Sequence, residues 1–592
     1  MMPKLIKIFI PSWVLILGIP YSIFAWDASG SSFSYTTLTT PTATNPSATG
    51  WTTPASSTSS NIAANSNVIS LPTALQNIFN KIDISGSGSL SATNIDQGLN
   101  AALDYTGNDK YLLIPQFTAI LNSSQLSDST KLLSLQNLVS INKNYLYGNT
   151  EKGLMIQPIL SLLLNGEHSQ KVIDSALTNI IYLADNERLD TQAKLCFITG
   201  TQDNPDLNLF KFYEQEALAA AAGKISMTDY TTVNNRIATA FNLLLYNKNI
   251  PYSDKEIVIT DMSNSTALQT TEEISSLTQT NFNVFLAQIL TDKDCPQDFI
   301  QKVVDTYSAE EWLNGSPYPT PSDVESVSDI LSAAAKSPQA TYANLQEINS
   351  AVHNFLSSSY SKDYDVRLAC LNVMSILSRD SRLNENEQTE IKKTIEQYGI
   401  TDANREIYQK YGTLVLAEDQ TLLTNRLIEI IDDVLKKAPA GETPEIISLT
   451  TKITQDGYLN NLKETIRLAG GYSNINNLIT IKVNSAYTDT DYLSTTSHET
   501  THYLDDNCLT TAQRAEADKL WQESDSKDDF AWDYGMSNKM DDLATMAEAI
   551  FTDPLLPEKD RVLTKAEQQA KTGDPTLLNK YNFVEKEIWG IS

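Results

Sequence analysis

Basic residues are few in this 592-residue chain, since 43 lysines and arginines stand against 72 aspartates and glutamates and give a formal net charge of −29. Such a surface repels phosphate backbones and anionic membrane faces. We therefore expect no nucleic-acid partner. The length and the 41% content of hydrophobic residues are sufficient for several buried cores, which indicates about two to four domains. Nothing in the composition indicates an oligomeric state.

Cysteine is also rare, and the four cysteines (Cys196, Cys295, Cys370 and Cys508) include no Cys-x-x-Cys pair. Their spacing gives no sign of a structural metal site or of a redox centre. Two alternatives stay open. The cysteines form up to two disulfides in an oxidising compartment, with a connectivity that the spacing leaves undetermined, or they are buried thiols in a chain too large to need disulfides.

Long apolar runs are confined to the N-terminus. Lys4 and Lys7 precede an apolar stretch that two prolines interrupt before the small residue Ala25, a pattern that predicts a secretory signal peptide over residues 1–25. An uncleaved membrane anchor is the alternative. No later segment approaches the about 18 consecutive apolar residues that a transmembrane helix requires. We expect a secreted or periplasmic protein without stable membrane insertion after signal cleavage.

The next segment, residues 26–70, consists largely of Ser, Thr, Ala, Asn and Pro with almost no charge. Such a run buries too little apolar surface to offset the entropy of the chain, so we interpret it as a linker or stalk.

A loop at residues 83–94 has the outline of an EF-hand. With Asp83 at the first ligand position, Gly88 falls at the sharp turn, but Ser85 and Ser87 replace carboxylates and Asn94 replaces the bidentate glutamate. Calcium affinity depends on the number of charged oxygen ligands. We expect calcium binding here to be weak or absent, in a degenerate helix-loop-helix.

Residues 71–437 are predicted to be helical, as one or two domains, because apolar residues recur there at spacings of three and four. Two such stripes are Val366, Ala369, Cys370, Val373, Ile376 and Leu377, and Leu423, Leu427, Ile430, Ile431, Val434 and Leu435. The stretch 365–371 is similar to the second helix of a HEAT-type repeat, but the sequence shows no regular period.

The pattern changes after residue 437. Residues 446–453 and 478–483 are apolar and rich in β-branched side chains, which predicts strands. We expect one further domain over residues 438–592, with the sheet next to the segment described below. An edge strand of such a sheet can pair with an extended polypeptide.

Two of only four histidines lie in the segment His498-Glu499-Thr-Thr-His502. On a helix, residues four apart lie on one face, so both imidazoles can bind one ion while Glu499 lies beside them. A chance occurrence is expected on the order of 10⁻³ times in a chain this poor in histidine. The motif predicts a Zn²⁺ site in which Glu499 is the general base for an attacking water. His168 and His353 have no ligand spacing.

A two-histidine helix needs a third ligand, usually a carboxylate on a later helix. The pattern His-Glu-x-x-His-x-x-Asp-Asp from residue 498 to 506, followed by Tyr534-Gly535-x-x-Asn538, resembles the anthrax lethal factor family of zinc metallopeptidases. The family's third ligand is a glutamate seven residues after the tyrosine, and the resemblance therefore implies Asp541 as the ligand. This aspartate is one methylene shorter, but aspartate also binds zinc. Glu548 and Asp542 are the alternatives.

The resemblance further implies that Tyr534 donates its phenol to the oxyanion of the attacked carbonyl. From spacing alone, Asp505 or Asp506 is expected to orient a ligating imidazole. The predicted fold is mainly α, with a C-terminal α+β zincin-like metallopeptidase domain.

The resemblance implies a zinc endopeptidase with a polypeptide substrate, and the predicted signal peptide implies that the protein is exported. The alternative is an exported helical interaction protein whose zincin domain is degenerate and non-catalytic.

Overall fold

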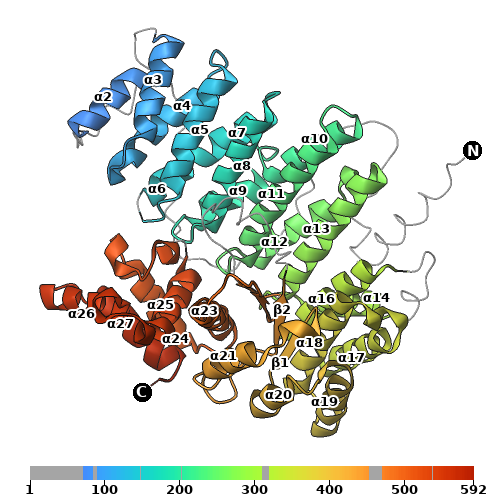
Figure 1. The fold of residues 1–592 in the computed structure, drawn as a ribbon. Helices are drawn as coiled ribbons and strands as arrows, with labels where there is room; N and C mark the ends of the chain where they lie inside the picture. Colours follow the sequence, from blue (N-terminus) through green and yellow to red (C-terminus); the bar gives the residue numbers. More distant parts are fainter. Residues whose placement is uncertain are drawn as a thin grey trace, which may run out of the picture.

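The computed structural model describes residues 71–84, 90–146, 148–201, 203–309, 319–451, 470–536 and 538–591. It confirms a mainly helical chain with a small mixed sheet in the C-terminal half (Figure 1). The predicted signal peptide over residues 1–25 and the linker predicted over residues 26–70 lie outside the described residues. So does the centre of the EF-hand-like loop, residues 85–89, whose flanking helices pack together as a helix-loop-helix.

Residues 73–399 form an array of helices in two rows, here called the helical array. Each helix of the inner row packs against the next helix of the same row. This row contains α3 (Ala92–Leu103), α5 (Asp128–Asn142), α8 (Gln170–Asp185), α11 (Met227–Tyr246), α13 (Glu272–Leu290), α16 (Pro321–Lys336) and α18 (Tyr364–Arg379). The helices of the inner row thus pack in a regular succession. The sequence shows no matching period because these helices differ in length.

The outer row covers the other side of these helices. It contains α2 (Thr73–Ile82), α4 (Ile114–Asn122), α7 (Ile156–Leu164), α9 (Thr191–Thr199), α10 (Leu209–Ala221), α12 (Tyr252–Ser263), α14 (Gln297–Tyr307), α17 (Tyr342–Ser357) and α19 (Glu385–Gly399), with the short α6 (Asn149–Lys152) between α5 and α7. The predicted apolar stripe of α18 is buried, from Val366 to Leu377, and forms part of one continuous core.

The C-terminal unit (residues 405–591) contains the sheet and the helices around it. Its strands are β1 (Leu414–Ala417), β2 (Ile446–Thr450), β3 (Gly470–Ser473) and β4 (Leu478–Lys482). Its helices are α20 (Arg405–Tyr411), α21 (Asn425–Leu435), α23 (Asp489–Asn507), α24 (Thr511–Glu523), α25 (Lys539–Thr552), α26 (Val562–Thr572) and α27 (Thr576–Phe583). The order of strands is β1-β2-β4-β3, in which only β3 runs antiparallel to its neighbour.

The parallel strands β1 and β2 are buried on both faces, as strands of parallel sheets usually are. Side chains alternate along a strand: Leu414 and Leu416 join the core of the helical array, while Val415 and Ala417 join the core of the C-terminal unit. Helix α18 contacts one side, where the Tyr364 hydroxyl lies 2.9 Å from the Ser448 hydroxyl, and α23 packs on β3 and β4. The sheet is therefore a wall shared by both halves of the molecule.

Strands predicted at 446–453 and 478–483 are confirmed as β2 and β4. The sequence prediction missed β1, which lies inside the region expected to be helical, because a four-residue buried strand has no alternation that distinguishes it from a helix segment. The sheet and its covering helix α21 thus begin before residue 438.

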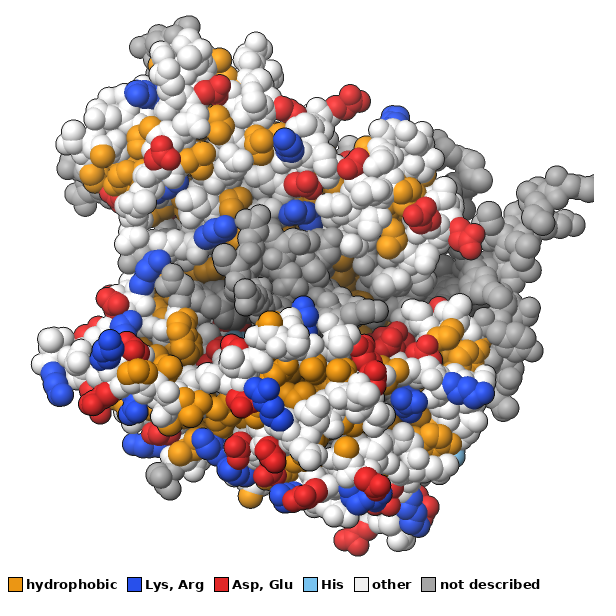
Figure 2. Space-filling view, in the orientation of Figure 1, with side chains coloured by type: hydrophobic (Ala, Val, Ile, Leu, Met, Phe, Trp, Pro, Cys, Tyr) orange, Lys and Arg blue, Asp and Glu red, His pale blue; other side chains and the backbone are white. Residues whose placement is uncertain are grey.

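The four cysteines are thiols in this structure, with Cys295 and Cys370 buried and Cys196 and Cys508 partly buried. Among the described residues, no helix is long and apolar enough to span a membrane. On the face seen in Figure 2, acidic and basic side chains are interspersed, so the net negative charge is not gathered into one patch there.

Leu414→Ala tests whether the sheet is a shared wall. Leu414 is fully buried between the array and the sheet, and the variant should lower the free energy of unfolding by about 2–5 kcal/mol because it leaves a cavity. Urea denaturation measures this change. Leu154→Ala is the matched control at a side chain that is 59% exposed, where we expect a change within about 0.5 kcal/mol. Equal effects of the two variants would contradict the shared wall.

Candidate metal centre

Helix α23 carries the histidine motif and is polar yet buried. Thr488 caps it, in a capping box with Asp491. Several hydroxyl side chains bond to carbonyls of their own helix, as Thr501 does to Ser497 at 2.7 Å, which satisfies them without outside partners. His498 and Glu499 are 8% and 6% exposed. A buried helix of this composition gains little from apolar burial, which is typical of a functional element.

Helix α25 supplies the facing carboxylates. Asn538 caps its N-terminus by accepting from the Asp541 backbone N–H, and its amide also donates to the Asp541 carboxylate at 2.8 Å. The helical array contributes here too, since Glu187 accepts from the Lys539 N–H at 3.1 Å. A carboxylate at a helix N-terminus is favourable. The start of α25, and with it Asp541, is thus held from both sides.

The structure brings His498, His502 and Asp541 together, with one potential ligand atom from each lying within 4.8 Å of the others. The two Nε2 atoms are 3.0 Å apart, and Nε2 of His502 is 3.5 Å from Oδ1 of Asp541. Ligands about 2.1 Å from one tetrahedral ion are about 3.4 Å from each other. Two imidazoles and one carboxylate are also a donor set that zinc favours, so these residues fit the predicted ion.

Glu548, the alternative third ligand, lies behind the cluster. Its Oε1 is 2.5 Å from Nδ1 of His498, and its Oε2 accepts from the Ser494 hydroxyl at 2.5 Å. A carboxylate on the second ring nitrogen fixes the orientation of an imidazole. Asp542, the other alternative, points elsewhere and forms a buried ion pair of 2.7 Å with Lys580.

The expectation that Asp505 or Asp506 orients an imidazole is not met. Asp506 contacts Lys248 at 3.1 Å and the Tyr472 hydroxyl at 3.1 Å, and Asp505 lies 3.9 Å from Arg514. Each aspartate instead lies beside a cation, Asp506 beside Lys248 and Lys336 and Asp505 beside Arg514. The carboxylate on the ring of His498 comes from another helix.

Glu499 lies next to strand β3 at the site. A Cβ atom on Gly470 would lie 2.5 Å from the Thr495 side chain and 3.1 Å from Oε1 of Glu499. Only glycine fits between β3 and α23 at this position. Strand β3 therefore packs directly against the Glu499 side chain, which lines the same cavity as the histidines.

The charges of the site are strongly coupled. Burial lowers the pKa of His498, but the charge and hydrogen bond of Glu548 outweigh it and raise that pKa to about 9. Burial and the charge of His498 lower the pKa of His502 to about 3. Burial raises the pKa of Glu499 to about 7, against the attraction of His498. Without an ion the imidazole pair therefore carries one positive charge, and a bound cation would displace the extra proton.

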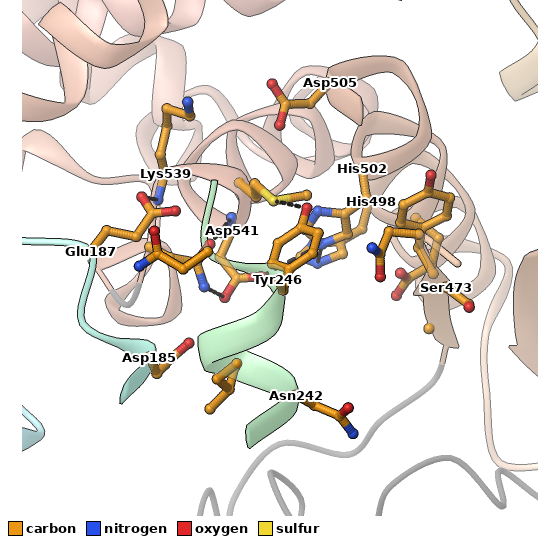
Figure 3. Close-up of a pocket in the computed structure, with 18 of the residues that line it drawn as sticks. Asp185, Glu187, Asn242, Tyr246, Ser473, His498, His502, Asp505, Lys539 and Asp541 are labelled. Atoms are coloured by element: carbon orange, nitrogen blue, oxygen red, sulfur yellow. Dashed lines mark hydrogen bonds and ion pairs between the residues drawn. The ribbon is translucent and has the colours of Figure 1, made fainter. Parts of the chain in front are cut away.

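A cavity of about 1240 Å³ opens onto the cluster between the helical array and the C-terminal unit. Figure 3 shows His498, His502 and Asp541 on one side and Tyr246 of α11 beside them, with Asp185 and Glu187 on the wall of the array. The Tyr246 hydroxyl is 2.8 Å from Sδ of Met540, next to Asp541. The array is therefore part of the wall around the cluster.

Sequence reasoning missed Tyr246, Glu187 and Tyr472, which reach the site from distant segments. Only Tyr472 has a local signal, because two glycines before an aromatic residue on a strand indicate a close backbone approach. Tyr534 lies in the 3₁₀ turn Asp533–Met536, but its side chain is outside the described part of the chain, so its predicted role stays a prediction.

No known protein family and no curated protein matches this chain. Two crystal structures of engineered proteins are similar at 13% identity each. One gives a TM-score of 0.27 over 45% of this chain and 96% of its own, and the other gives 0.26 over 55% and 82%. Likeness at this level identifies neither fold nor function.

Proposed function

We propose that this chain is an exported zinc-dependent endopeptidase. The observation that carries the proposal is the convergence of His498, His502 and Asp541 from two helices, with one potential ligand atom of each within 4.8 Å of the others and with Glu499 lining the same cavity. This arrangement is costly unless it is used, because it buries two imidazoles among several carboxylates.

A bound zinc ion would lower the pKa of a water and polarise the substrate carbonyl. His498, His502 and Asp541 would hold the ion, and Glu548 would keep the ring of His498 in a single orientation. Glu499 would accept a proton from the attacking water and pass it to the leaving amine. The Glu499 side chain is largely buried, which limits its contact with bulk water.

Polypeptide is the substrate class that suits the surroundings. Within the described residues, β3 has β4 as its single strand partner, and Gly470 to Ser473 line the cavity. An edge strand offers backbone hydrogen bonds to an extended chain. A peptide paired with β3 would run past Glu499, which lies next to Gly470.

Two variants, Asp541→Ala and Glu548→Ala, should distinguish the third metal ligand from the residue that orients His498. Asp541→Ala should abolish stoichiometric zinc binding because it removes one of three ligands. Glu548→Ala should keep stoichiometric zinc at saturation but lower affinity about 10–100-fold, through loss of the contact with His498. Competition with a chromophoric chelator measures both. Glu516→Ala, an exposed glutamate on α24, is the control and should bind as the wild type does. Zinc retained by Asp541→Ala but lost in Glu548→Ala would reverse the assignment.

Glu499→Gln should retain zinc and reduce hydrolysis of an unstructured polypeptide by about 10² or more, because the amide keeps the shape of the side chain but accepts no proton. Turnover is followed by the release of new amino termini, with and without chelator. Undiminished turnover in this variant would refute the mechanism. Wild-type protein that binds zinc and hydrolyses nothing would instead favour an exported interaction protein with a degenerate zincin domain.

A further inference from the structure

The two histidines of the cluster are held in different ways. Nδ1 of His498 contacts the Glu548 carboxylate at 2.5 Å. Nδ1 of His502 is buried and has no hydrogen-bond partner among the residues that the structure describes. An imidazole that binds a metal through Nε2 usually has its other nitrogen fixed by a hydrogen bond. Something else must fix the ring of His502.

That support is the ring of Tyr472 on β3. The two rings are offset-stacked, with centroids 6.4 Å apart and an angle of 16° between their planes. Such stacking restricts rotation of the imidazole about its Cβ–Cγ bond, a torsion angle that otherwise takes a broad range of values.

Tyr472 is itself fixed by its hydroxyl. The hydroxyl lies 3.1 Å from Oδ2 of Asp506 and 3.1 Å from Oδ1 of Asn477, and it accepts from the Asn507 amide at 3.0 Å. Asp506 and Asn507 belong to the last turn of α23, so the ring is tied to the helix that carries His502. Polar networks that are fully satisfied rigidify their members.

The network extends into the helical array through Lys336, the last residue of α16. Its ammonium group donates to the Asn474 carbonyl and to the Asn477 side chain, and it lies 4.0 Å from Oδ2 of Asp506. Its side chain is 13% exposed. Lys248, which follows α11, adds a contact of 3.1 Å to the other oxygen of Asp506. Two lysines of the array thus hold the carboxylate that holds Tyr472.

We infer that Tyr472 is a positioning residue for His502 and that Lys336 makes this positioning depend on the docked helical array. The inference rests on the proposed metal site. It assigns the helical array an indirect part in metal binding, through Lys336 and the ring of Tyr472. In this role Tyr472 is not a ligand of the ion, and its ring acts through the orientation of one ligand, His502.

Metal affinity of the full chain tests the inference independently of turnover. Tyr472→Leu removes ring and hydroxyl and should lower zinc affinity about 10–100-fold. Tyr472→Phe keeps the stacked ring, so its zinc affinity should fall by less than about tenfold. Lys336→Met should have an effect in the same range, because Lys336 contacts the partners of the Tyr472 hydroxyl and not the ring itself. Chelator competition gives the affinities, and visible absorption of the Co²⁺-loaded protein reports the ligand geometry.

Two variants control for general loosening. Tyr364→Phe removes a hydroxyl at the contact between array and sheet, and Lys255→Met removes a buried ion pair within the array, of 2.6 Å to Asp292. Neither contacts the network around Tyr472 in the described structure. Both should leave zinc affinity and the Co²⁺ spectrum unchanged.

The outcomes separate the two proposals. The inference would be overturned if the zinc affinity of Tyr472→Leu lay within about twofold of the wild-type affinity and its Co²⁺ spectrum were unchanged. The proposed metal site would then still stand. Loss of affinity in Tyr364→Phe equal to that in Tyr472→Phe would also overturn it. If Tyr472→Leu does not fold, Tyr472→Phe and Lys336→Met decide: both must bind zinc more weakly than Tyr364→Phe. A wild-type chain that binds no zinc would overturn the proposed function, and the inference with it.

Discussion

The packing of α23 against α25 is the contact on which the candidate site depends. Neither helix carries a complete set of ligands, since the imidazoles come from α23 and the carboxylate of Asp541 comes from α25. Glu548 joins the two helices by contacting Ser494 and His498, which lie one turn apart on α23. A shift of either helix by about 1 Å would disperse the cluster, because metal ligation tolerates deviations of only about 0.2 Å.

This contact depends in turn on the buried sheet. Helix α23 has little apolar surface of its own, so the apolar residues of β2 and β4 and the C-terminal helices supply most of the surrounding core. Trp589, which follows the last of these helices, illustrates the arrangement. Its indole N–H donates to the Thr501 hydroxyl on α23 at 3.2 Å. The polar helix is held by its neighbours rather than by its own burial.

The helical array forms one side of the candidate site. Glu187 contacts the first N–H of α25, Lys336 reaches the turn after β3, and Arg188 donates to the carbonyls of Trp521 and Ser524 at 2.6 and 3.0 Å. These contacts come from the ends of the inner-row helices, the side that faces the C-terminal unit (Figure 1). The cavity at the cluster is therefore lined both by residues of the array and by β3.

The sequence by itself determined the local features of this protein. Spacing placed His498, Glu499 and His502 on one helix, and apolar periodicity predicted the helical region and two of the strands, because these depend on residues close together in the chain. Tertiary structure decided which carboxylate meets which histidine: Asp541 lies beside His502, Glu548 lies behind His498, and Asp506 turns to Tyr472. It also decided the role of the array, since Lys336 lies 136 positions before Tyr472 in the numbering, and no local pattern encodes a contact over that distance.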